Sequence, residues 1–169
     1  MHAELVLDRQ ALAQRWQELC ADPNTPDYFE LNQFGELILS PRPTTRHQRI
    51  ASAIVRDLQG QLGPEAAVEI SVVTDQGVRV PDAVWMPPSE WVRAKNATPL
   101  PFAPDICVEV LSPGNTREEI EMKKGAYLRG GAREVIIVSV NGEVEFFGPE
   151  GKRAKSALGL TLQLPGEVL

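Results

Sequence analysis

The segment 105–111 is the sequence feature that most constrains the fold of this chain. It reads Asp-Ile-Cys-Val-Glu-Val-Leu, so apolar side chains stand at both odd and even positions. Alternate residues of a strand point to opposite faces of its sheet. Apolar residues on both faces are typical of a central strand that is covered on each side. A chain that contains such a strand is expected to form a layered α/β structure.

The remaining patterns predict helices and short strands around this segment. Apolar residues at helical spacing predict helices over 9–20, 45–59 and about 117–129, with Asp8, Thr44 or Thr45, and Asn115 or Thr116 as caps. Strands are predicted over 28–31, 36–39, 68–73, 78–86, 135–140, 143–147 and 158–164. A two-residue turn, Asn141-Gly142, joins two of them as a hairpin. The prolines between 87 and 104 predict a loop with one helical turn at Trp91. We therefore expect a mixed β-sheet flanked by helices.

The length and composition indicate one globular domain. A chain of 169 residues with 43% hydrophobic and 24% charged residues fits a single soluble domain over 1–169. Within it we expect an N-terminal helical extension (1–26), a core (27–147) and a C-terminal strand or tail (148–169). Cys20 and Cys107 lie in apolar surroundings, which predicts reduced core cysteines and a cytoplasmic location. No apolar run approaches the ~18 residues of a membrane span, and the first residues lack a signal-peptide pattern.

The charge balance narrows the function classes. The chain has 23 acidic and 17 basic residues, a formal net charge of −6, which disfavours a protein that coats nucleic acid by charge alone. It is compatible with an enzyme that meets phosphates through a metal. One region is locally basic: four arginines lie in or just before the predicted helix 45–59, with only Asp57 opposing them, namely Arg42, Arg46, Arg49 and Arg56. They form either a solvated face or a seat for phosphates near a helix N-terminus.

Two carboxylates occupy positions where the strand patterns expect apolar side chains. Asp82 interrupts an otherwise apolar face of 78–86, and Glu109 shares its strand face with Cys107 and Leu111. Burying a carboxylate costs several kcal/mol unless a cation or donors meet it. Asp82 is either solvated at a strand start or part of a site, and Glu109 either forms a buried salt bridge or binds a metal. Two such carboxylates on successive central strands favour a hard ion such as Mg²⁺.

A lysine and a histidine join these candidates. Lys123 follows Ile120 and precedes Tyr127 at helical spacing, so it lies on the stripe that should face the sheet. A lysine that only covers apolar surface, or one paired with Glu119, is the simpler interpretation. Lys124 is almost as well placed. His47 lies on the apolar face of its predicted helix, as a capping or core histidine or as a site residue.

The ordered set of these motifs resembles the Uma2 family of restriction-endonuclease-like proteins, within the PD-(D/E)XK nuclease superfamily. The likeness runs from about Tyr28 to Phe147 and rests on Glu30-Leu31, Gly35-Glu36-Leu37, His47-Gln48, Pro81-Asp82, Glu109-Val110-Leu111-Ser112-Pro113, and Lys123 followed by Tyr127 and Gly130. The resemblance implies a restriction-endonuclease-like α/β fold, with a mixed β-sheet flanked by helices. The lysine that the superfamily places two residues after the second carboxylate is replaced by Leu111, and the resemblance assigns its role to Lys123.

The resemblance also implies an activity and a set of roles. It implies metal-assisted hydrolysis of DNA phosphodiester bonds, with Asp82, Glu109 and Lys123 as catalytic residues. Asp82, Glu109 and the backbone carbonyl of Val110 would bind Mg²⁺, or Mn²⁺ in its place. His47, Glu30 and Glu119 are accessory candidates. Two alternatives remain: a catalytically inactive module that keeps the nuclease fold for binding, and a metal-stabilised homodimer.

Overall fold

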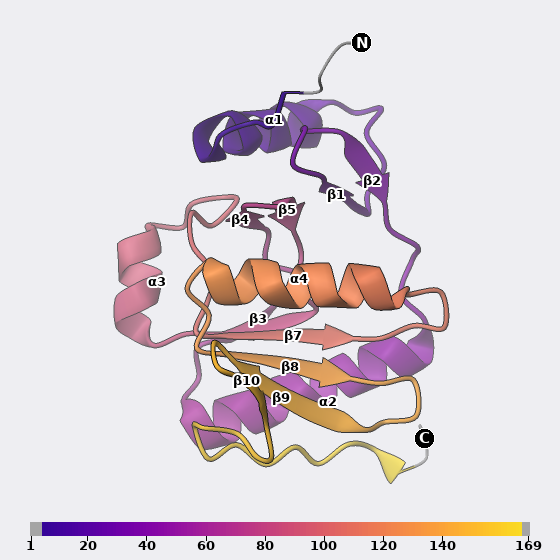
Figure 1. Ribbon diagram of the computed structural model, residues 1–169, viewed down its shortest axis with the longest axis vertical. Helices are drawn as coiled ribbons and strands as arrows, with labels where there is room; N and C mark the ends of the chain where they lie inside the picture. Colours follow the sequence, from indigo (N-terminus) through magenta and orange to yellow (C-terminus); the bar gives the residue numbers. More distant parts are fainter. Residues whose placement is uncertain (1–4, 167–169) are drawn as a thin grey trace.

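The structure, a computed structural model, describes residues 5–166. Its helices are α1 (Arg9–Ala21), α2 (Thr45–Leu62), α3 (Pro88–Ala94) and α4 (Arg117–Arg129). Its strands are β1 (Phe29–Leu31), β2 (Leu37–Leu39), β3 (Ala66–Val68), β4 (Val72–Thr74), β5 (Gly77–Arg79), β6 (Ala83–Trp85), β7 (Ile106–Val110), β8 (Glu134–Val138), β9 (Val144–Gly148) and β10 (Gly151–Arg153). They form a four-stranded sheet, β2-β1-β5-β4, and a six-stranded sheet, β10-β9-β8-β7-β6-β3 (Figure 1).

Strand β7 lies inside the six-stranded sheet, as its sequence predicts. It pairs antiparallel with β6 and parallel with β8, and α4 provides the crossover between β7 and β8. The two faces of β7 contribute to different apolar clusters: Ile106, Val108 and Val110 pack with α2, whereas Cys107 packs with Tyr127 of α4. Helices α2 and α4 therefore cover opposite faces of the sheet, as Figure 1 shows. The predicted α/β fold class is confirmed.

The smaller sheet has its own apolar cluster beneath α1. Leu12 and Trp16 of α1 pack on Leu31 and Val78, and the Trp16 ring stacks on Phe29 with 4.5 Å between ring centroids. Asp8 caps α1 by accepting a hydrogen bond from the Ala11 N–H, as predicted. Figure 1 shows α1 and this sheet at one end of the molecule, beyond α4.

The predicted strand 78–86 is wrong in one respect, because the chain divides it between the two sheets. Its first part is β5, which pairs with β4 and β1, and its last part is β6, which pairs with β3 and β7. The break falls at Pro81, which has no N–H to donate to a ladder. The predicted strand 68–73 is divided in the same way, between β3 and β4. Asp82 consequently stands at the start of a strand that runs beside β7.

The predicted two-residue hairpin turn is also wrong. The Gly142 N–H donates to the Ser139 carbonyl (3.0 Å) and the Ser139 N–H donates to the Glu143 carbonyl (2.9 Å). Gly142 has a φ of +79°, so a turn centred on Val140 and Asn141 is followed by a glycine in the left-handed region. The Ser139 hydroxyl accepts hydrogen bonds from the Asn141 and Glu143 N–H groups, which stabilises this longer connection.

The C-terminal segment does not form the predicted strand over 158–164. Its alternate leucines do pack on the α2 side of the sheet, but side chains of α2 take the hydrogen bonds that a neighbouring strand would supply. The Thr161 N–H donates to Gln61 Oε1 (2.8 Å), and the Gln163 N–H donates to Asp57 Oδ2 (2.7 Å). The edge strand of the sheet is instead β10.

Two further expectations concern the cysteines and the membrane. Cys107 is buried as predicted, but Cys20 is exposed because it lies on the outer side of α1. Within residues 5–166, the helices are too short or too polar to span a bilayer.

Candidate active site

Charged side chains gather where the two sheets meet beneath α4. We call Glu30 (β1), Arg79 (β5), Asp82, Glu109 (β7) and Lys123 (α4) the charged cluster. Glu30 and Arg79 are each 4% exposed and Glu109 is 8% exposed, and the Lys123 side chain is 12% exposed. Such burial is costly for charges unless they meet partners of opposite sign.

Asp82 is held against the backbone on both sides of Glu109. Its N–H donates to the Val108 carbonyl (2.9 Å), and its Oδ2 accepts a hydrogen bond from the Val110 N–H (2.6 Å). The Asp82 carboxylate thus accepts the hydrogen bond that the Val110 N–H would otherwise donate to a backbone carbonyl of the neighbouring strand. Asp82, the residue before β6, thus lies beside the part of β7 that contains Glu109.

Glu109 has both a hydrogen-bond donor and a cation at one oxygen. Its Oε1 accepts a hydrogen bond from the Tyr127 hydroxyl (2.7 Å) and lies 3.5 Å from Lys123 Nζ. Burial raises the pKa of Glu109 to about 8; Lys123 opposes the rise, and the charges of Asp82 and Glu30 add to it. Without a further cation, burial therefore favours the protonated form of Glu109.

Lys123 lies between two carboxylates. Its Nζ is 2.9 Å from Glu30 Oε1 and 3.5 Å from Glu109 Oε1. Burial alone would lower the pKa of Lys123, but Glu109 and Glu30 outweigh it and raise the pKa above its usual value. Lys123 is therefore charged at neutral pH. Lys124, the neighbouring candidate, pairs with Glu121 and lies 4.0 Å from the centre of the Phe147 ring instead.

Glu30 and Arg79 form the far side of the cluster. Arg79 Nη1 lies 3.2 Å from Glu30 Oε2, and the Val80 N–H donates to Glu30 Oε1 (2.8 Å). The guanidinium also donates to the Gln76 carbonyl. Sequence reasoning named Glu30 only as an accessory and missed Arg79. An arginine between Val78 and Val80, two residues before Pro81, was the available signal.

The remaining candidate residues, His47, Glu119 and Tyr127, make different contacts around the charged cluster. His47 Nε2 lies 3.2 Å from Asp82 Oδ1, and the hydrogen bond with Asp82 raises the pKa of His47. Glu119 lies one helical turn before Lys123 and accepts a hydrogen bond from Asn115 (3.3 Å). Tyr127, which the sequence suggested only through the motif, contacts Glu109 directly.

The donor set suits a hard divalent cation with an incomplete protein shell. Within residues 5–166, no group of three or more His, Cys, Asp and Glu side chains is arranged to hold a metal ion. Asp82 and Glu109 offer carboxylate oxygens from adjacent strands. Mg²⁺ usually takes one or two protein carboxylates and keeps several waters, so this pair fits the ion's needs.

A family match places the chain in the restriction-endonuclease-like class. The chain belongs to the Uma2 family, described as "Putative restriction endonuclease", whose sequence profile matches residues 13–166. The resemblance inferred from the motifs is confirmed.

A solved structure adds a fold match. A crystal structure from Anabaena variabilis ATCC 29413, described as a putative nuclease belonging to DUF820, matches with a TM-score of 0.65 and 21% identity over 85% of this chain and 90% of that one. This likeness shows the shared fold. No curated protein is significantly similar to the chain.

Proposed function

We propose that the chain is a Mg²⁺-dependent endonuclease that hydrolyses phosphodiester bonds of DNA, with Mn²⁺ able to replace Mg²⁺. The observation that carries the proposal is the position of the Lys123 ammonium, 3.5 Å from Glu109, while Asp82 accepts a hydrogen bond from the next residue of the same strand, Val110. A carboxylate pair with an adjacent cation is the set that metal-assisted phosphoryl chemistry requires.

The charge balance of the cluster supports a cation site. With Glu109 protonated, Glu30 and Asp82 carry two negative charges and Arg79 and Lys123 carry two positive ones. Ionised Glu109 leaves one negative charge uncompensated in a buried place. A bound divalent cation would offset that charge, which explains why a buried glutamate is useful here.

Each residue has a defined role in this proposal. Asp82, Glu109 and the Val110 carbonyl would hold the metal, and the chemistry it would supply is acidification of a bound water and polarisation of the phosphate. Tyr127 and Lys123 both meet Glu109 Oε1, which leaves Oε2 to face the cation. Lys123 would donate a hydrogen bond to the attacking water or to a phosphoryl oxygen as negative charge develops. Glu30, fixed by Arg79, positions Lys123.

A catalytically inactive binding module is the second candidate. The observation that favours it is that Lys123 already has two carboxylate partners, so the cluster also works as an internal salt-bridge network. In that case the cluster would join the two sheets without doing chemistry.

A cleavage assay separates the two. Supercoiled plasmid is incubated with the protein in Mg²⁺, Mn²⁺ or EDTA, and Asp82→Asn and Lys123→Gln are compared with Lys124→Gln as the matched control. We expect metal-dependent nicking that Asp82→Asn and Lys123→Gln abolish and Lys124→Gln retains, with thermal melts showing that each variant folds. A folded wild type that cuts neither DNA nor RNA with either metal supports the inactive module.

A further inference from the structure

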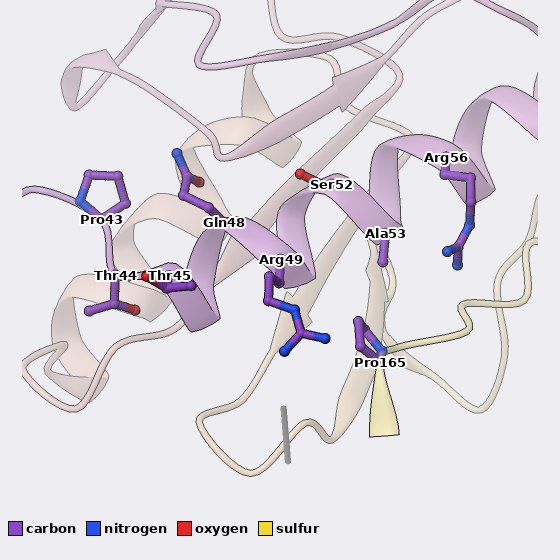
Figure 2. A pocket seen from close by; sticks show the side chains of 9 residues that line it. All are labelled: Pro43, Thr44, Thr45, Gln48, Arg49, Ser52, Ala53, Arg56 and Pro165. Carbon is purple, nitrogen blue, oxygen red and sulfur yellow. The ribbon is translucent and has the colours of Figure 1, made fainter. Parts of the chain in front are cut away.

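A groove runs along the outer side of α2. It is a shallow, open depression of about 580 Å³ between the helix and Pro165 of the C-terminal segment. The residues that line it are Pro43, Thr44, Thr45, Gln48, Arg49, Ser52, Ala53, Arg56 and Pro165. Figure 2 shows Arg49 and Arg56 projecting from the helix on either side of Pro165.

The chemistry of this lining differs from that of the chain as a whole. The described residues that line the groove include two arginines, three hydroxyl side chains and an amide, and no carboxylate. The whole chain has a net charge of −6. A basic groove in an acidic protein concentrates the local field on an anionic partner while the rest of the surface repels it.

The two arginines of the groove differ in how their guanidinium groups are held. Arg49 is exposed and makes no hydrogen bond or ion pair with any residue from 5 to 166. Arg56 is held by Asp57 Oδ1 (2.9 Å) and by the Gln163 carbonyl (2.9 Å), so its guanidinium is fixed at the groove edge. A fixed guanidinium loses less side-chain freedom when it binds phosphate.

The groove is connected to the charged cluster through neighbouring side chains. Gln48 lines the groove, and its Oε1 lies 3.3 Å from His47 Nδ1, while His47 Nε2 lies 3.2 Å from Asp82. From Thr45 to Arg56 the helix rises about 16 Å at 1.5 Å per residue. At 3.4 Å per nucleotide of one strand, that length spans roughly five nucleotides.

We propose that this groove binds the sugar-phosphate backbone of a DNA duplex and leads it to Asp82. The proposal rests on the proposed function, because the link to Asp82 is what favours DNA over another polyanion such as an acidic peptide. Arg49 and Arg56 bind phosphates, and the hydroxyls of Thr45 and Ser52 donate hydrogen bonds to them. These contacts fix the position of the duplex and read no base sequence.

Binding measured without cleavage tests the groove separately from the chemistry. A short labelled DNA duplex is titrated with protein in EDTA at several salt concentrations, using wild type, Arg49→Gln, Arg49→Glu and Arg56→Gln. Arg133→Gln is the matched control, because Arg133 is an exposed arginine that precedes β8 and does not line the groove. Among the described residues its guanidinium has one ion-pair partner, Asp105 at 3.6 Å. Thermal melts of Arg56→Gln check that the C-terminal segment stays in place.

We expect Arg49→Gln and Arg56→Gln each to reduce the slope of log affinity against log salt by about 0.9, and Arg133→Gln to leave it unchanged. Arg49→Glu should weaken binding further. Equal binding by wild type and the groove variants overturns the groove while leaving the nuclease proposal intact. An RNA duplex is titrated in parallel, and tight binding of RNA without binding of DNA overturns both proposals. Loss of affinity in the groove variants of a protein that cuts nothing supports the groove and refutes the nuclease. A wild type that binds no DNA refutes the groove.

Discussion

Replacing Glu109 by glutamine should make the metal-free protein more stable at high pH. The substitution removes a buried negative charge but keeps an acceptor for the Tyr127 hydroxyl, and Lys123 retains Glu30 at 2.9 Å. In wild type, burial raises the pKa of Glu109 from 4.5 to about 8. Between these pH values the folded protein holds a proton that the unfolded chain has released, so wild-type stability falls as pH rises through this window.

The size of the effect follows from the width of the window. At 1.36 kcal/mol per pKa unit, the interval from 4.5 to 8 corresponds to about 5 kcal/mol, reached above pH 8. Urea unfolding in EDTA at about pH 5 and about pH 8 measures it. Over these roughly three pH units the difference should move by about 4 kcal/mol in favour of Glu109→Gln. If instead the variant is less stable by a constant amount at both pH values, Glu109 is an ordinary ionised partner of Lys123 and the reasoning fails.

Three further outcomes are expected. Mg²⁺ at a hundredfold excess over its dissociation constant should stabilise wild type by about 2.7 kcal/mol in thermal melts. Less Mg²⁺ should be needed above pH 8 than at pH 6, because binding needs ionised Glu109, and Glu109→Gln should lose most of the stabilisation. Asp82→Asn should fold, as judged by circular dichroism, but fail to nick plasmid in Mg²⁺, since the amide keeps an acceptor for Val110 yet loses the charge that a metal needs. Glu30→Gln should cost about 3–5 kcal/mol in urea unfolding, because Arg79 and Lys123 lose their shared carboxylate; an unchanged midpoint would show that the pairing contributes little.

The sequence identified candidate residues because they are charged at positions where the strand or helix periodicity predicts apolar side chains. Glu109 was detectable because β7 is apolar on both faces, and Lys123 because its helix presents it toward the sheet. The register of β6 and β7 then brings Asp82 beside Glu109. These inferences needed only the periodicity of strands and helices.

The residues that the sequence missed depend on contacts between distant segments. Arg79 meets Glu30 across 49 positions of the chain, through the pairing of β5 with β1. No local periodicity shows which carboxylate a buried arginine will meet. For the same reason, the sequence indicated only an accessory role for Glu30.

The errors in the fold have a common physical origin. In the segment 158–164 the apolar alternation was correct, but alternation does not say where the backbone N–H groups will find acceptors. Here Gln61 and Asp57 supply them from a helix. At Ser139, a hydroxyl likewise altered a hairpin that the Asn-Gly pair alone favoured in a shorter form.

The charged cluster also links the two sheets of the molecule through salt bridges. Glu30 and Arg79 come from the four-stranded sheet, and Glu109 comes from the six-stranded sheet, with Lys123 bridging them. Asp82 takes no part in that bridge; it contacts His47 and the backbone of β7. If the chain has the proposed nuclease activity, a descendant that lost this activity would still be selected to keep Glu30, Arg79 and Lys123 for folding. In such a descendant, Asp82 should be the first residue of the charged cluster to be replaced.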